Sequence, residues 1–265
     1  QITKLPTTMP SMNKIKADTN ALTIWCEKYP GQVVYSSKLD GVSGLLHLRK
    51  GEDPKLYSRG NGIEGQCITH LLNVFKSESE NIKSAFSSLL ESDELGNENT
   101  LIVRGEFIMK KAAFAKYSTE ASNARNLVSG LINRKDYDTK SKEQLKDMDF
   151  VAYEIVEPVM KPSMQMRTLE TMGLKTVFNG IWEDGPKAEK LTELLQERRS
   201  DDEYEIDGII VTQDKVYERN ENKVENPKHA FAYKMILSDQ MVEAKVVDVL
   251  WEPSPQGYIK PRVRI

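Results

Sequence analysis

Residues 36–41 read Ser-Ser-Lys-Leu-Asp-Gly and directly follow an apolar run, Val-Val-Tyr at 33–35, that is typical of a strand. A Lys-x-Asp-Gly tetrapeptide leaving a strand is expected to place an amine and a carboxylate on a tight loop. Lys38 and Asp40 are two residues apart, so in an extended segment their side chains would project to the same side. Gly41 would let the chain turn sharply or let a ligand approach closely.

This arrangement is suited to a nucleophilic lysine. An amine that attacks phosphorus must be partly deprotonated near neutral pH, and desolvation or neighbouring cations lower the pKa of a lysine far enough. The tetrapeptide alone is equally compatible with an exposed lysine and aspartate at a turn. The segments that follow decide between these two interpretations.

Composition indicates a soluble globular protein. The chain has 265 residues, 39% hydrophobic and 29% charged, which is enough for one large domain or two smaller ones. We find neither a run of membrane-spanning length nor the apolar core of a signal peptide. A net charge of −3 argues against a chain coated in positive charge, so nucleic-acid contacts would need a local basic patch.

The metal-ligating residue types are few and scattered. Two cysteines in unrelated contexts are expected to be reduced thiols in a cytosolic protein and to form no zinc cluster, and three single histidines are expected to be structural. These residues are Cys26, Cys67, His47, His70 and His229.

Hydrophobic periodicity predicts a mixture of helices and strands along the chain. Helices are expected at 18–29, 63–75, 110–117, 122–133 and 186–199. Strands are expected at 44–49, 55–58, 101–108, 150–156, 205–211, 230–235, 242–251 and 258–265. The first two of these strands flank a Gly-Glu-Asp-Pro turn and predict a hairpin.

Several of these segments carry polar residues that have two readings. The glycine-rich turn at 59–65 suits a phosphate or ribose but also an ordinary hairpin exit. Glu106 lies either at an exposed strand edge or in a functional position. Asn123 and Arg125 either reach into a cleft or serve as a helix cap and a solvated cation. Lys234, among apolar neighbours, needs an anion, for which a bound phosphate is a candidate.

Taken together and in order, these segments resemble the nucleotidyltransferase core shared by DNA ligases, RNA ligases and mRNA-capping enzymes. The set covers about 200 residues and is more specific than any one of its motifs. The matching positions are Lys38-Leu39-Asp40-Gly41, Arg104-Gly105-Glu106, Tyr153, Asp207-Gly208 and Lys234.

Within that group the chain is most similar to NAD-dependent DNA ligases. Residues 8–13, Thr-Met-Pro-Ser-Met-Asn, resemble the stretch that contacts adenine in that family. Residues 59–65 resemble its Arg-Gly-Asp-Gly-x-x-Gly loop, and residues 123–126 resemble its Asn-Pro-Arg-Asn. Residues 249–261 look like the opening of the OB-fold that follows the core.

The resemblance implies a DNA ligase that uses NAD⁺ and Mg²⁺ and works through a covalent lysine nucleotidyltransferase step. Catalytic roles fall on Lys38, Asp40, Asp207 and Lys234, and metal binding on Asp40 and Asp207. The implied nucleotide-binding residues are Ser11, Met12, Lys38, Leu39, Arg59, Glu106, Arg125, Tyr153, Ile209 and Lys234. Among these, Glu106 would hold the ribose hydroxyls, and Tyr153 would stack on adenine.

The sequence also departs from the family pattern. Ser36 stands where the family usually has a glutamate, and Thr212 stands where it has a lysine, five residues after Asp207. Lys215 is a candidate substitute for that lysine. The nicotinamide-side domain, the zinc module, the helix-hairpin-helix repeats and a complete OB-fold are not expected within these residues. We therefore expect a fragment, or a reduced ligase of viral type.

The expected fold is α+β, a nucleotidyltransferase (ATP-grasp-like) core of antiparallel sheets with outer helices, followed by the start of an OB-fold. Residues 1–237 would form the adenylation domain and 238–265 the incomplete OB-fold. The expected partners are nicked double-stranded DNA and NAD⁺ or AMP. We expect a monomer that is not bound to a membrane and that works in the cytoplasm of a bacterium or of a virus-infected host cell, with the nucleus as the alternative location. Alternatives are an ATP-dependent DNA or RNA ligase, a GTP-dependent capping enzyme, and a catalytically silent module that binds nicked nucleic acid.

Overall fold

The computed structural model describes residues 2–17, 20–73, 83–84, 86–88, 99–219, 223–235, 243–254 and 257–265. The chain divides into two compact units, Gln1–Lys234 and Met235–Ile265. The expected domain boundary after residue 237 falls outside the described residues and stays a prediction.

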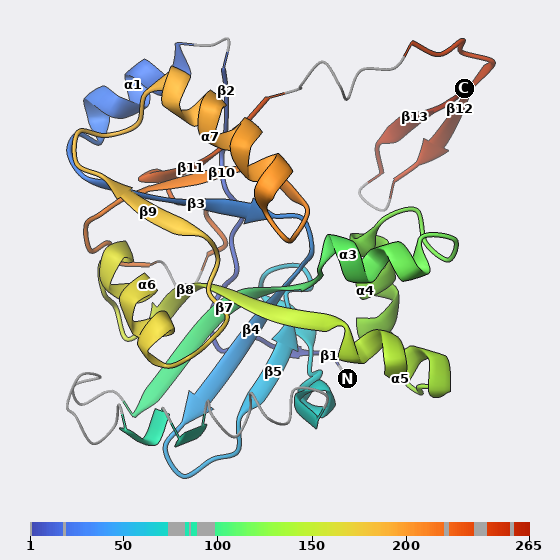
Figure 1. Ribbon diagram of the computed structural model, residues 1–265, viewed down its shortest axis with the longest axis horizontal. Helices are drawn as coiled ribbons and strands as arrows, with labels where there is room; N and C mark the ends of the chain where they lie inside the picture. Colours follow the sequence, from blue (N-terminus) through green and yellow to red (C-terminus); the bar gives the residue numbers. More distant parts are fainter. Residues whose placement is uncertain are drawn as a thin grey trace. The chain divides into compact units, whose positions relative to one another are not determined.

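Two β-sheets dominate the larger unit (Figure 1). The five-stranded sheet has the order β2 (Lys14–Lys16), β11 (Ala230–Lys234), β10 (Ile206–Gln213), β3 (Val33–Leu39) and β9 (Asn179–Trp182). The four-stranded sheet has the order β5 (Lys55–Ser58), β4 (Val42–Arg49), β7 (Thr100–Met109) and β8 (Met148–Glu157). A separate pair joins β1 (Ile2–Lys4) and β6 (Glu64–Gln66). Neighbouring strands in these sheets are antiparallel except β2 and β11, which are parallel.

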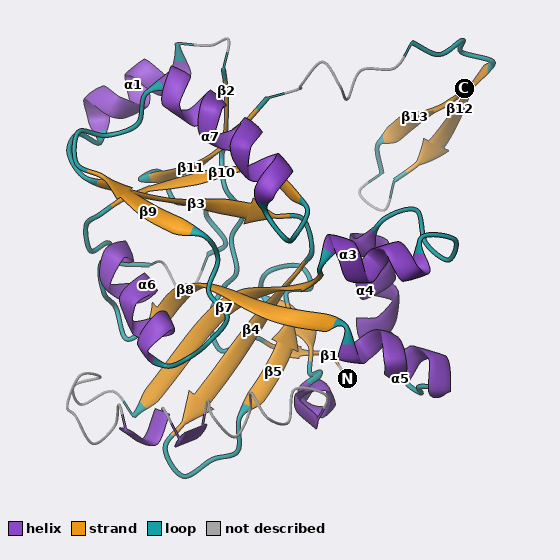
Figure 2. Cartoon of the chain, viewed as in Figure 1, coloured by secondary structure: helices purple, strands orange, loops and turns teal. Residues whose placement is uncertain are grey.

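The helices lie on the outside of these sheets (Figure 2). Helix α7 contacts β10, α4 contacts β4 and β7, and α5 and α6 contact β8. None of the helices in the described part of the chain is long and apolar enough to cross a bilayer. The described helices are α1 (Ala21–Lys28), α3 (Lys111–Phe114), α4 (Ala124–Ile132), α5 (Thr139–Lys146), α6 (Pro162–Thr171), α7 (Ala188–Asp201) and the 3₁₀ turns η1 (Thr69–Asn73) and η2 (Ala115–Tyr117). The observed architecture confirms the expected α+β class.

The turn after β3 carries the chain from one sheet to the other. Strand β3 belongs to the five-stranded sheet, and β4, which begins at Val42, belongs to the four-stranded sheet. Gly41 has no room for a side chain, because a Cβ there would meet the carbonyl oxygen of Phe107 and lie 2.8 Å from Cγ of Glu106. The glycine is therefore needed for the close approach of β7, and its φ is not in the left-handed region.

Some sequence expectations need correction. Lys38 lies within strand β3 itself, and the turn begins only at Asp40. The helix expected at 63–75 is β6 followed by η1, with residues 74–75 outside the described part. The helix expected at 186–199 begins after Lys187, so Pro186 precedes it. Strands β1, β2 and β9 were not predicted, because segments of three or four residues carry too little periodicity.

The smaller unit contains one antiparallel hairpin, β12 (Asp248–Pro253) and β13 (Ile259–Arg264). The two expected strands are confirmed, although the first begins later than residue 242. All residues of both strands are exposed, Trp251 and Ile259 among them. The assignment of this hairpin to the start of an OB-fold stays a prediction.

The two glycines Gly41 and Gly130 are expected to respond to alanine in opposite directions. Gly41→Ala should lower the free energy of unfolding by about 2 kcal/mol or more, because the new methyl group would be forced against backbone. Gly130 lies exposed in α4 with open space around it, so Gly130→Ala should raise stability by about 0.5–1 kcal/mol. Urea unfolding of both variants measures this, and equal effects would contradict the packing argument.

Candidate active site

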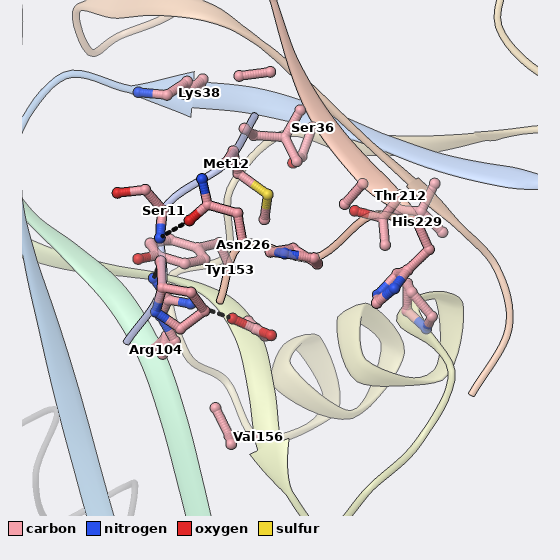
Figure 3. Close-up of a pocket in the computed structure, with 18 of the residues that line it drawn as sticks. Ser11, Met12, Ser36, Lys38, Arg104, Tyr153, Val156, Thr212, Asn226 and His229 are labelled. Carbon is pink, nitrogen blue, oxygen red and sulfur yellow. Dashed lines mark hydrogen bonds and ion pairs between the residues drawn. The ribbon is translucent and has the colours of Figure 1, made fainter. Parts of the chain in front are cut away.

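A cleft of about 750 Å³ lies between the two large sheets of the larger unit. Its floor comes from β3, β10 and β11, and its opposite wall from β7, β8 and α6. Figure 3 shows Lys38 and Ser36 on β3, across the pocket from Arg104 and Val156. The volume falls within the range of small-molecule and cofactor sites.

The cleft is cationic although the chain carries a net charge of −3. Among the described residues its lining has ten lysines and arginines against five acids, which favours an anionic ligand. The basic residues are Lys14, Lys38, Arg59, Arg104, Arg125, Lys215, Arg219, Lys223, Lys228 and Lys234, and the acids are Glu106, Glu154, Asp207, Glu218 and Glu225.

A β-bulge aims Asp207 into the cleft. In the ladder between β3 and β10, Ile206 is opposite Leu39 and Gly208 is opposite Lys38, so Asp207 is the extra residue of the bulge. Its Oδ1 lies 2.9 Å from Nζ of Lys38, and its Oδ2 lies 2.5 Å from Nζ of Lys234.

Asp207 therefore holds two lysines with one carboxylate. Burial raises the pKa of Asp207, but the hydrogen bond and charge of Lys234 together with those of Lys38 outweigh it and hold the pKa below its usual range. The anion that we expected for Lys234 is this carboxylate in the structure, in place of a phosphate.

Glu106 faces the same end of the cleft from β7. The turn after β3 places Ser43 directly opposite Glu106, and the Ser43 hydroxyl donates a hydrogen bond of 3.1 Å to Oε2 of the glutamate. Glu106 is only 8% exposed, and this burial raises its pKa from 4.5 to about 7, against the opposing effects of Ser43, Lys38 and the nearby arginines. The alternative of an exposed strand edge is thus wrong.

A buried ionic network that we did not predict lies beside Glu106. Arg104 pairs with Glu154 at 3.1 Å and donates to the carbonyl of Pro10 at 3.0 Å, and Arg219 also pairs with Glu154. The guanidinium of Arg104 lies 5.6 Å from the centroid of the Tyr153 ring. Burial raises the pKa of Tyr153. The sequence signal for this network was the presence of a second charged residue, Arg104, beside Glu106 in a mostly apolar strand.

The predicted residues near the N-terminus also line the cleft. Ser11 and Met12 do so directly, and the backbone N–H of Ser11 donates to Asn226. Arg59 donates from Nε to the carbonyl of Met9 and from Nη2 to the Ser11 hydroxyl, both at 3.0 Å. Arg59 thus holds this segment in place, and its contact with a phosphate stays a prediction.

Asp40 and Arg125 form an ion pair of 2.9 Å at the mouth of the site. Both readings of residues 123–126 hold, because the Asn123 side chain caps α4 while Arg125 reaches the cleft lining. Asp40 itself is not among the lining residues. Ile209, which we expected to bind the nucleotide, is not a lining residue either, because it is fully buried on the face of β10 that points away from the cleft. Its neighbour Ile210 lines the cleft instead.

The described residues contain no group of three or more His, Cys, Asp or Glu side chains that could hold a metal ion. Asp207 is engaged by two lysines and Asp40 by Arg125. A Mg²⁺ ion bound here would therefore need oxygens from a ligand or water in addition to these carboxylates. The metal roles of Asp40 and Asp207 stay predictions.

The raised pKa of Glu106 has a consequence for stability. The folded protein binds this proton more tightly than the unfolded chain, so between pH 4.5 and about 7 unfolding releases a proton, and stability should fall as pH rises. The contribution is up to about 1.4 kcal/mol per pH unit. Urea unfolding across this range should show that Glu106→Gln lacks this component, and parallel pH profiles for the two proteins would contradict it.

Comparisons with known proteins identify the family. The family model described as NAD-dependent DNA ligase adenylation domain matches residues 13–237. A DNA ligase of Acanthamoeba polyphaga mimivirus is 39% identical over 261 residues, 98% of this chain and 38% of that protein. Putative DNA ligase 205R of Invertebrate iridescent virus 6 is 31% identical over 276 residues, 99% of this chain and 41% of that protein.

The solved structure named "Pmar-Lig_Pre." superposes with a TM-score of 0.53 at 16% identity, over 97% of this chain and 55% of that one, which bears on the fold alone. This chain spans about two fifths of the length of the two viral relatives. On the extent of the family match and the identity to the viral ligases, the chain belongs to the NAD-dependent DNA ligase adenylation domain family.

Proposed function

We propose that this chain forms lysyl-AMP on Lys38 from NAD⁺ and transfers the AMP to the 5′-phosphate of nicked DNA, so that the nick can be sealed. The observation that carries this proposal is the Lys38 amine, held 2.9 Å from Asp207 in a cationic cleft of a chain that belongs to the adenylation-domain family. Splitting the transfer through a covalent intermediate avoids bringing two polyanions together in one step.

In the first step the Nζ atom of Lys38 attacks the phosphorus of the AMP half of NAD⁺. The new N–P bond forms as the bond from that phosphorus to the bridging oxygen breaks, the amine loses a proton, and nicotinamide mononucleotide leaves. Asp207 orients the amine, and Lys234, on the other oxygen of the same carboxylate, lies close enough to stabilise charge on the phosphate.

The remaining cleft residues would position the nucleotide. Glu106 faces the cleft from β7 and can accept or donate a hydrogen bond near pH 7, which suits ribose hydroxyls. Tyr153, packed on Arg104, offers a ring face for adenine. Thr212 and Lys215 also line the cleft, which supports the proposal that Lys215 supplies the positive charge that a lysine at position 212 would give.

The proposal includes NAD⁺ as the AMP donor, Mg²⁺ as the metal and nicked DNA as the acceptor. It also includes a monomeric state and a cytoplasmic location. The family match supports NAD⁺ over ATP, and the relatives named DNA ligase support DNA as the acceptor. When bound with the nucleotide, Mg²⁺ would neutralise phosphate charge during transfer.

The proposal predicts an acid-labile label on the protein after incubation with NAD⁺ that carries ³²P in the adenylate phosphate. Lys38→Ala should abolish this label, because no other nucleophile replaces the amine. Lys50→Ala, an exposed lysine on the β4–β5 turn, is the matched control and should label like the unmodified protein. Intact mass before and after incubation measures the same change without radioactivity.

Parallel incubations with ATP and GTP separate the alternatives. Label from ATP alone would move the chain to the ATP-dependent ligases, and label from GTP would indicate a capping enzyme. Nick binding without label from any nucleotide would indicate a silent binding module. Transfer of the label from labelled protein to nicotinamide mononucleotide, with formation of labelled NAD⁺, would support the NAD⁺ reaction in the reverse direction.

A further inference from the structure

A buried hydroxyl lies directly behind the reactive lysine. Ser37 precedes Lys38 in β3 and borders the cleft, and in the ladder between β3 and β10 it lies within a layer of buried apolar residues that includes Leu39, Ile206 and Ile209. Ser37 is only 3% exposed. A hydroxyl in such a layer costs free energy unless it finds a hydrogen-bond partner.

That partner is a buried carboxylate outside the cleft. The Ser37 hydroxyl donates to Oδ2 of Asp202 at 2.9 Å, and Asp202 is 8% exposed. The same carboxylate accepts from Arg198 Nη2 at 3.0 Å and from the backbone N–H of Tyr204 at 3.2 Å. Asp202 is thus fully engaged by groups of α7, of β3 and of the connection that leads to β10.

This connection ends in the bulge that presents Asp207. Asp202 follows the last residue of α7, and β10 begins at Ile206. In the same connection, just before the bulge, the carbonyl of Glu205 accepts a hydrogen bond of 2.9 Å from the backbone N–H of Asp40. Strand β3 is therefore tied to the start of β10 at Ser37, through Asp202, and at Asp40, through Glu205.

We propose that Ser37 and Asp202 are positioning residues that fix the register of the bulge and so hold the Asp207 carboxylate against Lys38. The extra residue of a bulge interrupts the ladder, and a slip of one position would turn Asp207 to the opposite face. Apolar side chains in place of Ser37 and Asp202 would fill the same space, but they would form no directional hydrogen bond between β3 and the connection that leads to β10. The role rests on the proposed lysine chemistry.

The test is single-turnover adenylation at saturating NAD⁺, together with the Kd of the protein for AMP. Ser37→Ala should lower the adenylation rate about tenfold or more, because small misplacements of reacting groups are costly, while the Kd stays within about twofold. Ser37→Thr keeps the hydroxyl on a residue type that suits a strand and should restore the rate. Asp202→Asn should lower the rate as Ser37→Ala does.

A stability control separates positioning from general weakening of the fold. Leu195 is fully buried on α7, so Leu195→Ala should lower the melting temperature by leaving a cavity. Assayed well below that temperature, it should adenylate like the unmodified protein. The proposal is overturned if Ser37→Ala keeps the full rate, or if Leu195→Ala slows the reaction as much.

A second measurement does not depend on activity. Hydrogen exchange at the backbone amides of residues 206–208 should accelerate in Ser37→Ala and not in Ser37→Thr, because the register of the bulge is loosened. Unmodified protein that takes no label would contradict the proposed function, and the exchange result would still decide the positioning role. Unchanged exchange in Ser37→Ala would refute that role.

Discussion

One carboxylate, that of Asp207, lies between two ammonium groups that would otherwise repel each other across the floor of the cleft. Lys38 and Lys234 come from strands on either side of β10, and only a side chain projecting from β10 between them can reach both. The bulge supplies that projection, because it leaves Asp207 outside the regular ladder. The charge of this triad is net positive, so this end of the cleft favours an anionic group.

The electrostatics of the cleft contrast with those of the whole molecule. An acidic chain concentrates basic side chains on one concave surface, which directs anions to that surface and not to the rest of the protein. Several of these cationic side chains also stabilise the fold. Arg59 and Arg104 donate to backbone carbonyls of Met9 and Pro10, so the N-terminal segment is held against the cleft by the same groups that make it positive.

The two sheets meet at the short turn after β3, and this explains why the site lies there. Gly41 allows β7 to approach so closely that Glu106 and the β3 lysine share one end of the cleft. Behind β3, the Ser37–Asp202 bond connects the same strand to α7 and to the beginning of β10. The position of the Lys38 amine thus depends on three features: the pairing of β3 with β10, the close approach of β7 at Gly41, and the hydrogen bond between Ser37 and Asp202.

The sequence by itself determined the order of the long strands, the hairpin of β4 and β5, and the motif residues Lys38, Glu106, Asp207 and Lys234, because periodicity and short motifs are local properties of the chain. Only the tertiary structure decided which groups meet. The pairing of Asp207 with both lysines and the place of Ile210 instead of Ile209 in the lining follow from the register of one bulge. The burial that raises the pKa of Glu106 depends instead on the packing of β7, which approaches the backbone closely at Gly41. Register depends on contacts between residues about 170 positions apart, and no local pattern encodes such contacts.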